Sequence, residues 1–120
     1  MRQQCRLINS YRYELAMSRE VIAIRELEYA AKGKEARCRL TIKVFKPYLL
    51  QQGKVPFSFS PGTSGCELKF EGLDTKRFDT VFYGADMLQA LQFAADVEPI
   101  LKRISQDYDL YFETGEPYFE

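Results

Sequence analysis

Carboxylate and aromatic side chains alternate near the C-terminal end of the chain. The residues concerned are Asp107, Asp109, Tyr111, Glu113, Glu116 and Tyr118. Their spacing lacks the glycine and the final glutamate of a calcium-binding loop. Carboxylates can instead steer a basic partner, and tyrosines can anchor it, as at many protein interfaces. We therefore expect these six residues to bind a partner. The alternative is that the even-numbered aromatic residues belong to the core and the acids are merely solvated.

The absence of histidine argues against most enzyme classes. The chain has no histidine, so neither a Ser-His-Asp triad nor a Cys-His pair can form, and the commonest metal ligand is missing. The glycine-containing loop "SPGTSG" lacks the G-K-[ST] ending of a phosphate-binding loop. We expect a protein that is not an enzyme and that has no cofactor and no metal.

Charge is distributed unevenly between the two halves of the chain. Residues 1–60 carry 12 Lys/Arg and 5 Asp/Glu, whereas residues 61–120 carry 5 and 12, although the net charge is zero. If the fold separates the halves, the molecule has a basic side and an acidic side. If strands from both halves interleave, the surface is mixed. A basic side over residues 2–46, including Arg37 and Arg39, would suit nucleic acid, but the neutral total charge argues against that partner.

Alternating apolar residues predict an antiparallel sheet. A strand is expected from residue 36 to 44, two more around residues 66–70 and 78–82, and a further one in "EVIAIRELEYAA", joined to the first by the turn "KGKE". Residues 108–112 alternate in the same way and predict a fifth strand or a docked tail. The fold class we expect is α+β: a β-meander of four to five strands with one long helix across one face.

The helix is expected in the stretch "FYGADMLQALQFAADVEPILKRI", residues 82–104. Leu88, Leu91 and Ala95 follow helical spacing, so we expect them to pack on the sheet. Pro99 lacks an N–H and its ring collides with the preceding turn, which costs about 3 kcal/mol in a straight helix. A kink is therefore expected, or a second short helix beginning near residues 96–98 with Pro99 in its first turn.

Two segments do not fit this regular pattern. The connection 46–65 is long for a loop between strands, and it contains Phe57 and Phe59 among small polar residues. These phenylalanines either complete the core from an edge strand or sit on a mobile loop as additional contacts with a partner. Residues 1–16 precede a natural-looking start at Met17, so we interpret them as an N-terminal arm.

The length and the apolar pattern indicate one domain in the cytoplasm. A chain of 120 residues has room for a single core, so we expect one domain over residues 1–120. No apolar run approaches the length needed to cross a bilayer, and the first residues lack the apolar core of a signal peptide. An odd number of cysteines, none spaced as C-x-x-C, fits a cytoplasmic protein.

The helix start carries a resemblance. The residues "GADMLQAL", from Gly84 to Leu91, resemble the G-x-D-x-L-Q-A-L helix start of a group of small uncharacterised bacterial proteins, in which a β-meander precedes the helix. The long 46–65 loop, Pro99 and the N-terminal arm depart from that pattern. By general type, the chain also resembles the immunity proteins of bacterial toxin systems, including contact-dependent inhibition. That resemblance implies a protein partner, a basic toxin domain, which the acidic and aromatic end would cover; it leaves the oligomeric state unknown.

Overall fold

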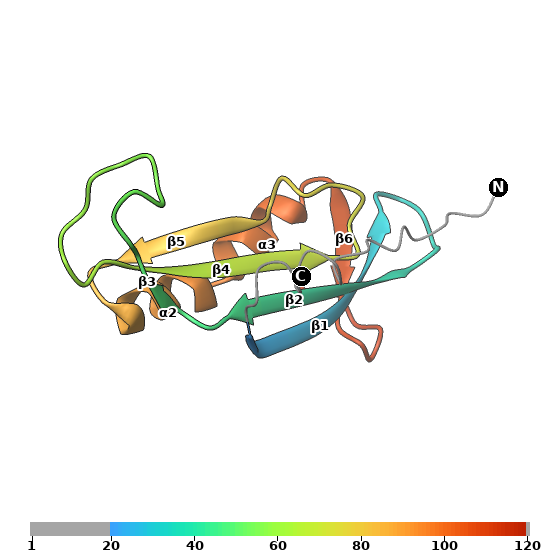
Figure 1. Cartoon of the computed structure of the whole chain (residues 1–120). Coiled ribbons are helices and arrows are strands. Elements are labelled where there is room, and N and C mark those ends of the chain that lie inside the picture. Colours follow the sequence, from blue (N-terminus) through green and yellow to red (C-terminus); the bar gives the residue numbers. More distant parts are fainter. Residues whose placement is uncertain (1–19, 120) are drawn as a thin grey trace.

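The computed structural model describes residues 20–119 as an antiparallel sheet with a bent helix packed against it (Figure 1). The N-terminal arm expected at residues 1–16 lies outside the described residues. The strands are β1 (Val21–Ala31), β2 (Cys38–Phe45), β3 (Tyr48–Leu49), β4 (Ser64–Glu71), β5 (Thr80–Gly84) and β6 (Tyr108–Tyr111), and the helical segments are α2 (Met87–Ala95) and α3 (Glu98–Ile104). The predicted α+β class is confirmed.

The sheet is a four-stranded meander extended by two short strands. β1, β2, β4 and β5 follow one another as antiparallel neighbours, and β3 continues the line of β2 along β4. The helix then crosses the sheet and carries the chain back to β1, where β6 pairs antiparallel at the opposite edge from β5. This crossover places the acidic end of the chain directly beside strands from its basic half.

The core lies between the sheet and the helix. Leu27 and Tyr29 of β1 point to the helix side, and so do alternate residues of β2 and β4, as the period-two pattern predicts. The strand and helix residues buried in this layer are Cys38, Leu40, Ile42, Val44, Cys66, Leu68, Phe70, Ala90, Ala94, Ile100, Leu101 and Ile104. Cys66 is a free cysteine, whereas Cys38 is not a free thiol. The cysteines therefore give no support to the expectation of a reducing, cytoplasmic compartment.

The helix is bent by 35° where the sequence predicts a kink. α2 ends at Ala95, and α3 begins at Glu98 with Pro99 in its first turn, where the missing N–H costs no hydrogen bond. Asp86 caps α2, because its carboxylate accepts the N–H of Gln89 at 2.8 Å. Because of this bend, α3 runs in a different direction from α2, and its apolar residues are buried in the core.

The predicted packing face of α2 is wrong for Leu88 and Ala95, whereas Leu91 is partly buried against the core as expected. Leu88 is 65% exposed and Ala95 is exposed, whereas Ala90 and Ala94 are fully buried against the sheet. The reason is a close approach: a Cβ added to Gly84 of β5 would lie 2.5 Å from the Ala90 nitrogen. Only small residues fit so near the strand, so the alanines take the inner face and the larger side chains turn outward.

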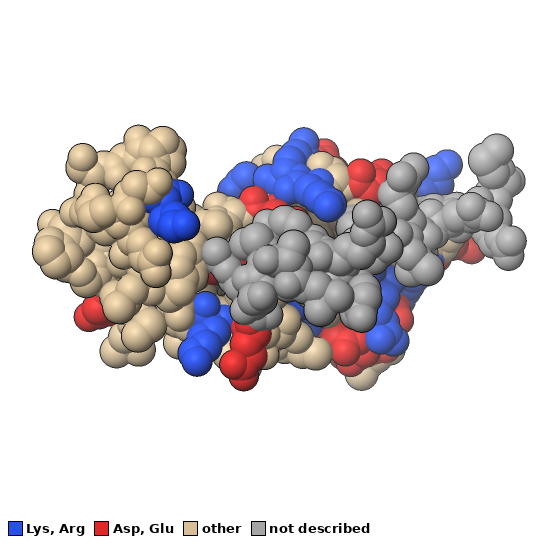
Figure 2. Space-filling view, in the orientation of Figure 1, with Lys and Arg blue, Asp and Glu red and all other residues tan. Residues whose placement is uncertain are grey.

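The sheet face opposite the helix is polar. Glu67 and Lys69 of the central strand β4 lie on it and are each 6% exposed, and Lys43 of β2 forms an ion pair with Glu71 at 3.0 Å. Figure 2 shows lysine, arginine and acidic residues close to one another over much of the molecule. Of the two arrangements that the sequence left open, the described residues therefore adopt the mixed one.

Candidate partner-binding surfaces

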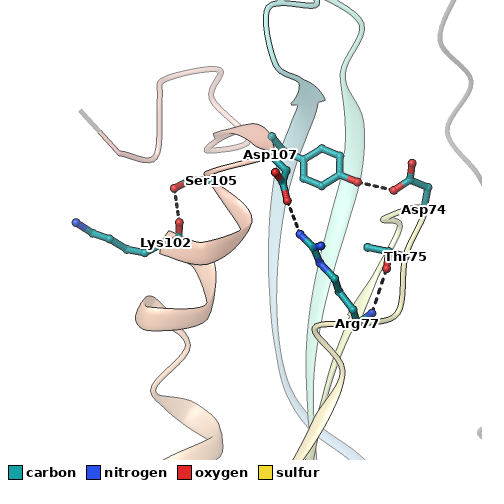
Figure 3. A network of polar contacts seen from close by, with 7 residues as sticks. Asp74, Thr75, Arg77, Lys102, Ser105 and Asp107 are labelled. Carbon is teal, nitrogen blue, oxygen red and sulfur yellow. Dashed lines mark hydrogen bonds and ion pairs between the residues drawn. The ribbon is translucent and has the colours of Figure 1, made fainter.

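The two aspartates at the start of the acidic end are ion-paired within the molecule. Asp107 binds the guanidinium of Arg77, from the loop between β4 and β5 (Figure 3). Asp109 pairs with Lys32 at 3.2 Å and also accepts the backbone N–H of Gly33 at 3.3 Å, at the β1–β2 turn. Both carboxylates therefore help to attach β6 and the turn before it to the rest of the sheet.

The two tyrosines of the predicted set also have internal partners. The ring of Tyr111 lies 3.6 Å from the guanidinium carbon of Arg37, a cation–π contact. The hydroxyl of Tyr118 donates to Glu98 at the start of α3, and Arg25 donates to that hydroxyl at 2.9 Å. Burial and the hydrogen bond to Glu98 raise the pKa of Tyr118. The tyrosines thus hold the last residues of the described chain against β1, β2 and α3.

Only the two glutamates of the predicted set are exposed without a side-chain partner in the described part of the chain. Glu113 and Glu116 lie in the turn after β6, where the backbone carbonyl of Glu116 accepts the N–H of Phe112 at 2.8 Å. Phe112 itself is 42% exposed. Most residues of the acidic end therefore attach β6 to the rest of the fold, and only Glu113 and Glu116, which we call the acidic tip, form an exposed acidic surface.

Phe57 and Phe59 are far from the acidic end. They lie in the loop after β3, at the end of the sheet opposite β6 (Figure 1), and the molecule is 51 Å long. The loop does not complete the core: Phe57 is 42% exposed, and its ring contacts Phe59 at 6.2 Å and Tyr83 of β5 at 5.2 Å between centroids. The eight predicted contact residues thus fall into two separate groups.

Exposed apolar side chains gather at the end of the molecule that carries this loop. β3, the end of β5 and the start of α2 meet there, since β3 and Gly84 both pair with Ser64, and Gly62 approaches Ala85. We call this set the apolar end; its residues, each at least 40% exposed, are Leu49, Phe57, Tyr83, Met87 and Leu88. On the face drawn in Figure 2, few charged residues lie at this end.

Sequence reasoning missed Met87 and Leu88 as surface residues. Helical spacing cannot show which face of a short helix is inward when alanine and leucine alternate along it. The signal that could have found them is Gly84 followed by Ala90 and Ala94, because a glycine in a strand often marks a close backbone approach.

The basic residues proposed for nucleic acid are paired with acids. Arg39 forms an ion pair with Glu26 at 2.8 Å, and Arg37 lies 3.7 Å from Glu28 in addition to its contact with Tyr111. Cross-strand pairs of this kind follow from the register of β1 and β2. The described residues of these strands therefore present alternating charges and no continuous basic stripe.

Tyr108 has a strongly raised pKa. Its hydroxyl binds Asp74 (Figure 3), and its ring meets Tyr29 edge-on at 5.3 Å. Burial, together with the neighbouring carboxylate, raises the pKa of Tyr108 to about 12. Burial also raises the pKa of Tyr29, whose hydroxyl donates to the carbonyl of Gly72. These protonated hydroxyls attach the β4–β5 loop to β1 and β6 and are not poised to act as bases at neutral pH.

The described residues form neither a metal site nor a helix that could cross a membrane. Residues 20–119 contain no group of three or more Cys, Asp or Glu residues placed to hold a metal ion. None of the helices in the same range is long and apolar enough to cross a membrane. The chain matches no protein-family model, and neither a curated protein nor a solved structure shows significant similarity to it.

Proposed function

We propose that this protein is a non-catalytic binding protein that anchors its partner at the apolar end. The observation that carries the proposal is that five large apolar side chains are exposed at one end of the molecule, of which Phe57 and Tyr83 are in contact. Exposed apolar surface that gathers in one region often marks an interaction site, and aromatic residues and methionine are enriched at interfaces. Phe57 packs edge-on against Tyr83 and is therefore already restrained before binding. Its side chain loses less conformational entropy when a partner binds.

The biological role proposed is that of a cytoplasmic immunity protein. Such a protein would bind a cognate bacterial toxin domain and occlude its active surface. Glu113 and Glu116 are exposed and carry charge that would attract a basic domain, although they lie at the other end of the molecule from the apolar anchor. In this role the glutamates affect the association rate, and the apolar end determines the dissociation rate.

Site-specific photo-crosslinking in the native host tests where the partner binds. A photoreactive phenylalanine analogue replaces Phe57 in one variant and Phe112 in another; both side chains are 42% exposed and they lie at opposite ends. The proposal expects one protein to be crosslinked from position 57 and not from position 112. Crosslinking from position 112 alone would place the interface at the acidic end and contradict the assignment of the apolar end.

The immunity role itself is tested by toxicity. The captured partner is expressed alone, with the wild-type protein, and with Phe57→Ser or Phe112→Ser. The partner is expected to arrest growth alone, with rescue by wild type and by Phe112→Ser and much weaker rescue by Phe57→Ser. If the partner is harmless when expressed alone, the immunity role is contradicted, although the proposal of a binding protein still holds.

A further inference from the structure

The two edges of the sheet differ in whether another segment covers them. Beside β6, the chain folds back on itself. Pro117 forms an antiparallel β-bridge with Tyr111, and the Tyr118 N–H donates to the Leu110 carbonyl at 2.9 Å. At the other edge, β5 pairs with β4 and with no other described strand. Its sequence, "TVFYG", contains no charge and no proline, the residues that usually protect an edge. The β5 edge is therefore suited to accept another strand.

The hydrogen-bonding direction of β5 follows from its neighbour. The Phe70 N–H of β4 points to the β5 side, because it donates to the Asp79 carboxylate at 2.8 Å. Residues of β4 alternate in direction, so Leu68, paired with Thr80, also faces β5. Val81 and Tyr83 are therefore the residues of β5 whose N–H and C=O point away from β4, toward the open edge, and no described residue bonds those of Val81.

A groove of about 470 Å³ runs along this edge between β5 and the bent helix. Its walls combine apolar and charged side chains; they include Phe78, Phe82, Phe93, Ile100, Asp96 and Arg103. Phe93 is 45% exposed within it. A strand added to β5 would direct alternate side chains into this groove, an arrangement by which sheet edges recognise extended peptides.

The groove is lined by four charged side chains, of which Arg103 is the cation without an ion pair among the described residues. Near the start of the strand, the guanidinium carbon of Arg103 lies 5.6 Å from the centre of the Phe78 ring. Arg103 has no ion pair among residues 20–119, unlike its neighbour Arg77, which binds Asp107. Asp96, at the α2–α3 junction, and Asp79, just before β5, also line the groove, and the Asp79 carboxylate accepts the Phe70 N–H. A bound segment is therefore favoured if its carboxylate lies beside the start of β5.

We propose that an extended segment of a partner protein adds antiparallel to β5, with an apolar side chain in the groove and a carboxylate two residues later, beside Arg103. Antiparallel pairing runs the segment toward the start of β5, and residues two apart share one face of a strand. This site adjoins the apolar end at Tyr83 but differs from it in chemistry, because it uses the backbone of Val81 and the charge of Arg103.

A second copy of this chain fits the groove less well. Self-pairing would place another β5 along the edge, and Thr80–Gly84 contains no carboxylate to meet Arg103. Charge complementarity therefore favours a partner segment of the pattern apolar–x–acidic over a symmetric dimer.

Fluorescence anisotropy with two labelled, end-blocked octapeptides, TVTFTETT and TVTFTKTT, tests the proposal on the full chain. The wild-type protein is expected to bind the first about tenfold more tightly than the second, as a close charge pair allows. Arg103→Glu is expected to reverse this preference. Val81→Pro is expected to weaken binding of both peptides about tenfold without lowering the melting temperature, since that N–H has no bond to β4. Phe57→Ser, at the apolar end, leaves both affinities unchanged.

Several outcomes would overturn the proposal. These are no binding of TVTFTETT to the wild type, equal affinity for the two peptides, or binding that Val81→Pro leaves intact. Sedimentation at several concentrations gives an independent check: a dimer that forms without peptide and disappears in Val81→Pro would show that the edge serves a second copy instead.

Discussion

Asp86 shows how one side chain fixes the start of the helix that covers the core. Its carboxylate accepts the N–H of Gln89, and the side-chain oxygen of Gln89 accepts the N–H of Ala85 at 2.7 Å. Asp86→Ala removes the cap and is expected to lower the free energy of unfolding by about 1 kcal/mol in urea denaturation. Asp86→Asn retains an acceptor oxygen and should lose far less; equal losses in the two variants would contradict the capping role.

Tyr108 makes stability sensitive to alkaline pH. Its pKa is about 12 in the folded protein, above the ordinary value of 10.0, so the folded state holds this proton more tightly. Its contribution to stability is fully present below pH 10 and is lost as pH rises through 12. Tyr108→Phe is expected to make the fall in melting temperature between these pH values shallower. An unchanged slope in thermal unfolding would show that the Tyr108 proton is not linked to folding.

The candidate site was only partly predictable from residue types. The sequence identified the acidic and aromatic residues, but it could not show that Asp107 meets Arg77 or that Asp109 meets Lys32. Those pairs join residues far apart in the chain, and their positions depend on the crossover that brings β6 beside β1. By contrast, Phe57 stands out in the sequence because it lies in a long loop with few charges.

At the scale of elements, the tail after β6 closes one edge of the sheet. Tyr118 and Phe119 pack partly against the core, and their rings stack edge-on at 5.0 Å. Ending the chain after Tyr111 is expected to lower the free energy of unfolding by about 3 kcal/mol, from lost apolar burial. The control, Glu113→Ala with Glu116→Ala, is expected to change it by less than about 0.5 kcal/mol. A truncated protein as stable as the full chain would refute this closing role.

The strands and the bend were predictable because they depend on local rules. Alternation identifies β1, β2, β4 and β6, and proline chemistry places the bend near Pro99. The inner face of α2 was not predictable from hydrophobic spacing. Its choice depends on how closely Gly84 lets the helix approach β5, a tertiary constraint that makes small side chains preferable to large ones.

At the scale of the whole molecule, the fold mixes the charges of the two halves and separates two kinds of surface. Ion pairs across strands, such as Arg39 with Glu26, use the basic residues of the first half internally. Five of the nine large apolar side chains that are exposed in the described chain lie at one end, and the glutamates of the acidic tip lie at the other, along a molecule 51 Å long. A compact partner that contacts the apolar end would therefore not also cover Glu113.

The most direct test of the central claim is the dissociation constant of the crosslinked partner, measured by calorimetry for three proteins. Phe57→Ser with Leu88→Ser is expected to weaken binding at least about 30-fold, as for anchor residues worth about 2 kcal/mol or more. Glu113→Lys with Glu116→Lys is expected to change affinity only a few-fold. The opposite ranking, with affinity kept by the apolar variant and lost in the glutamate variant, would contradict the claim that the apolar end is the anchor.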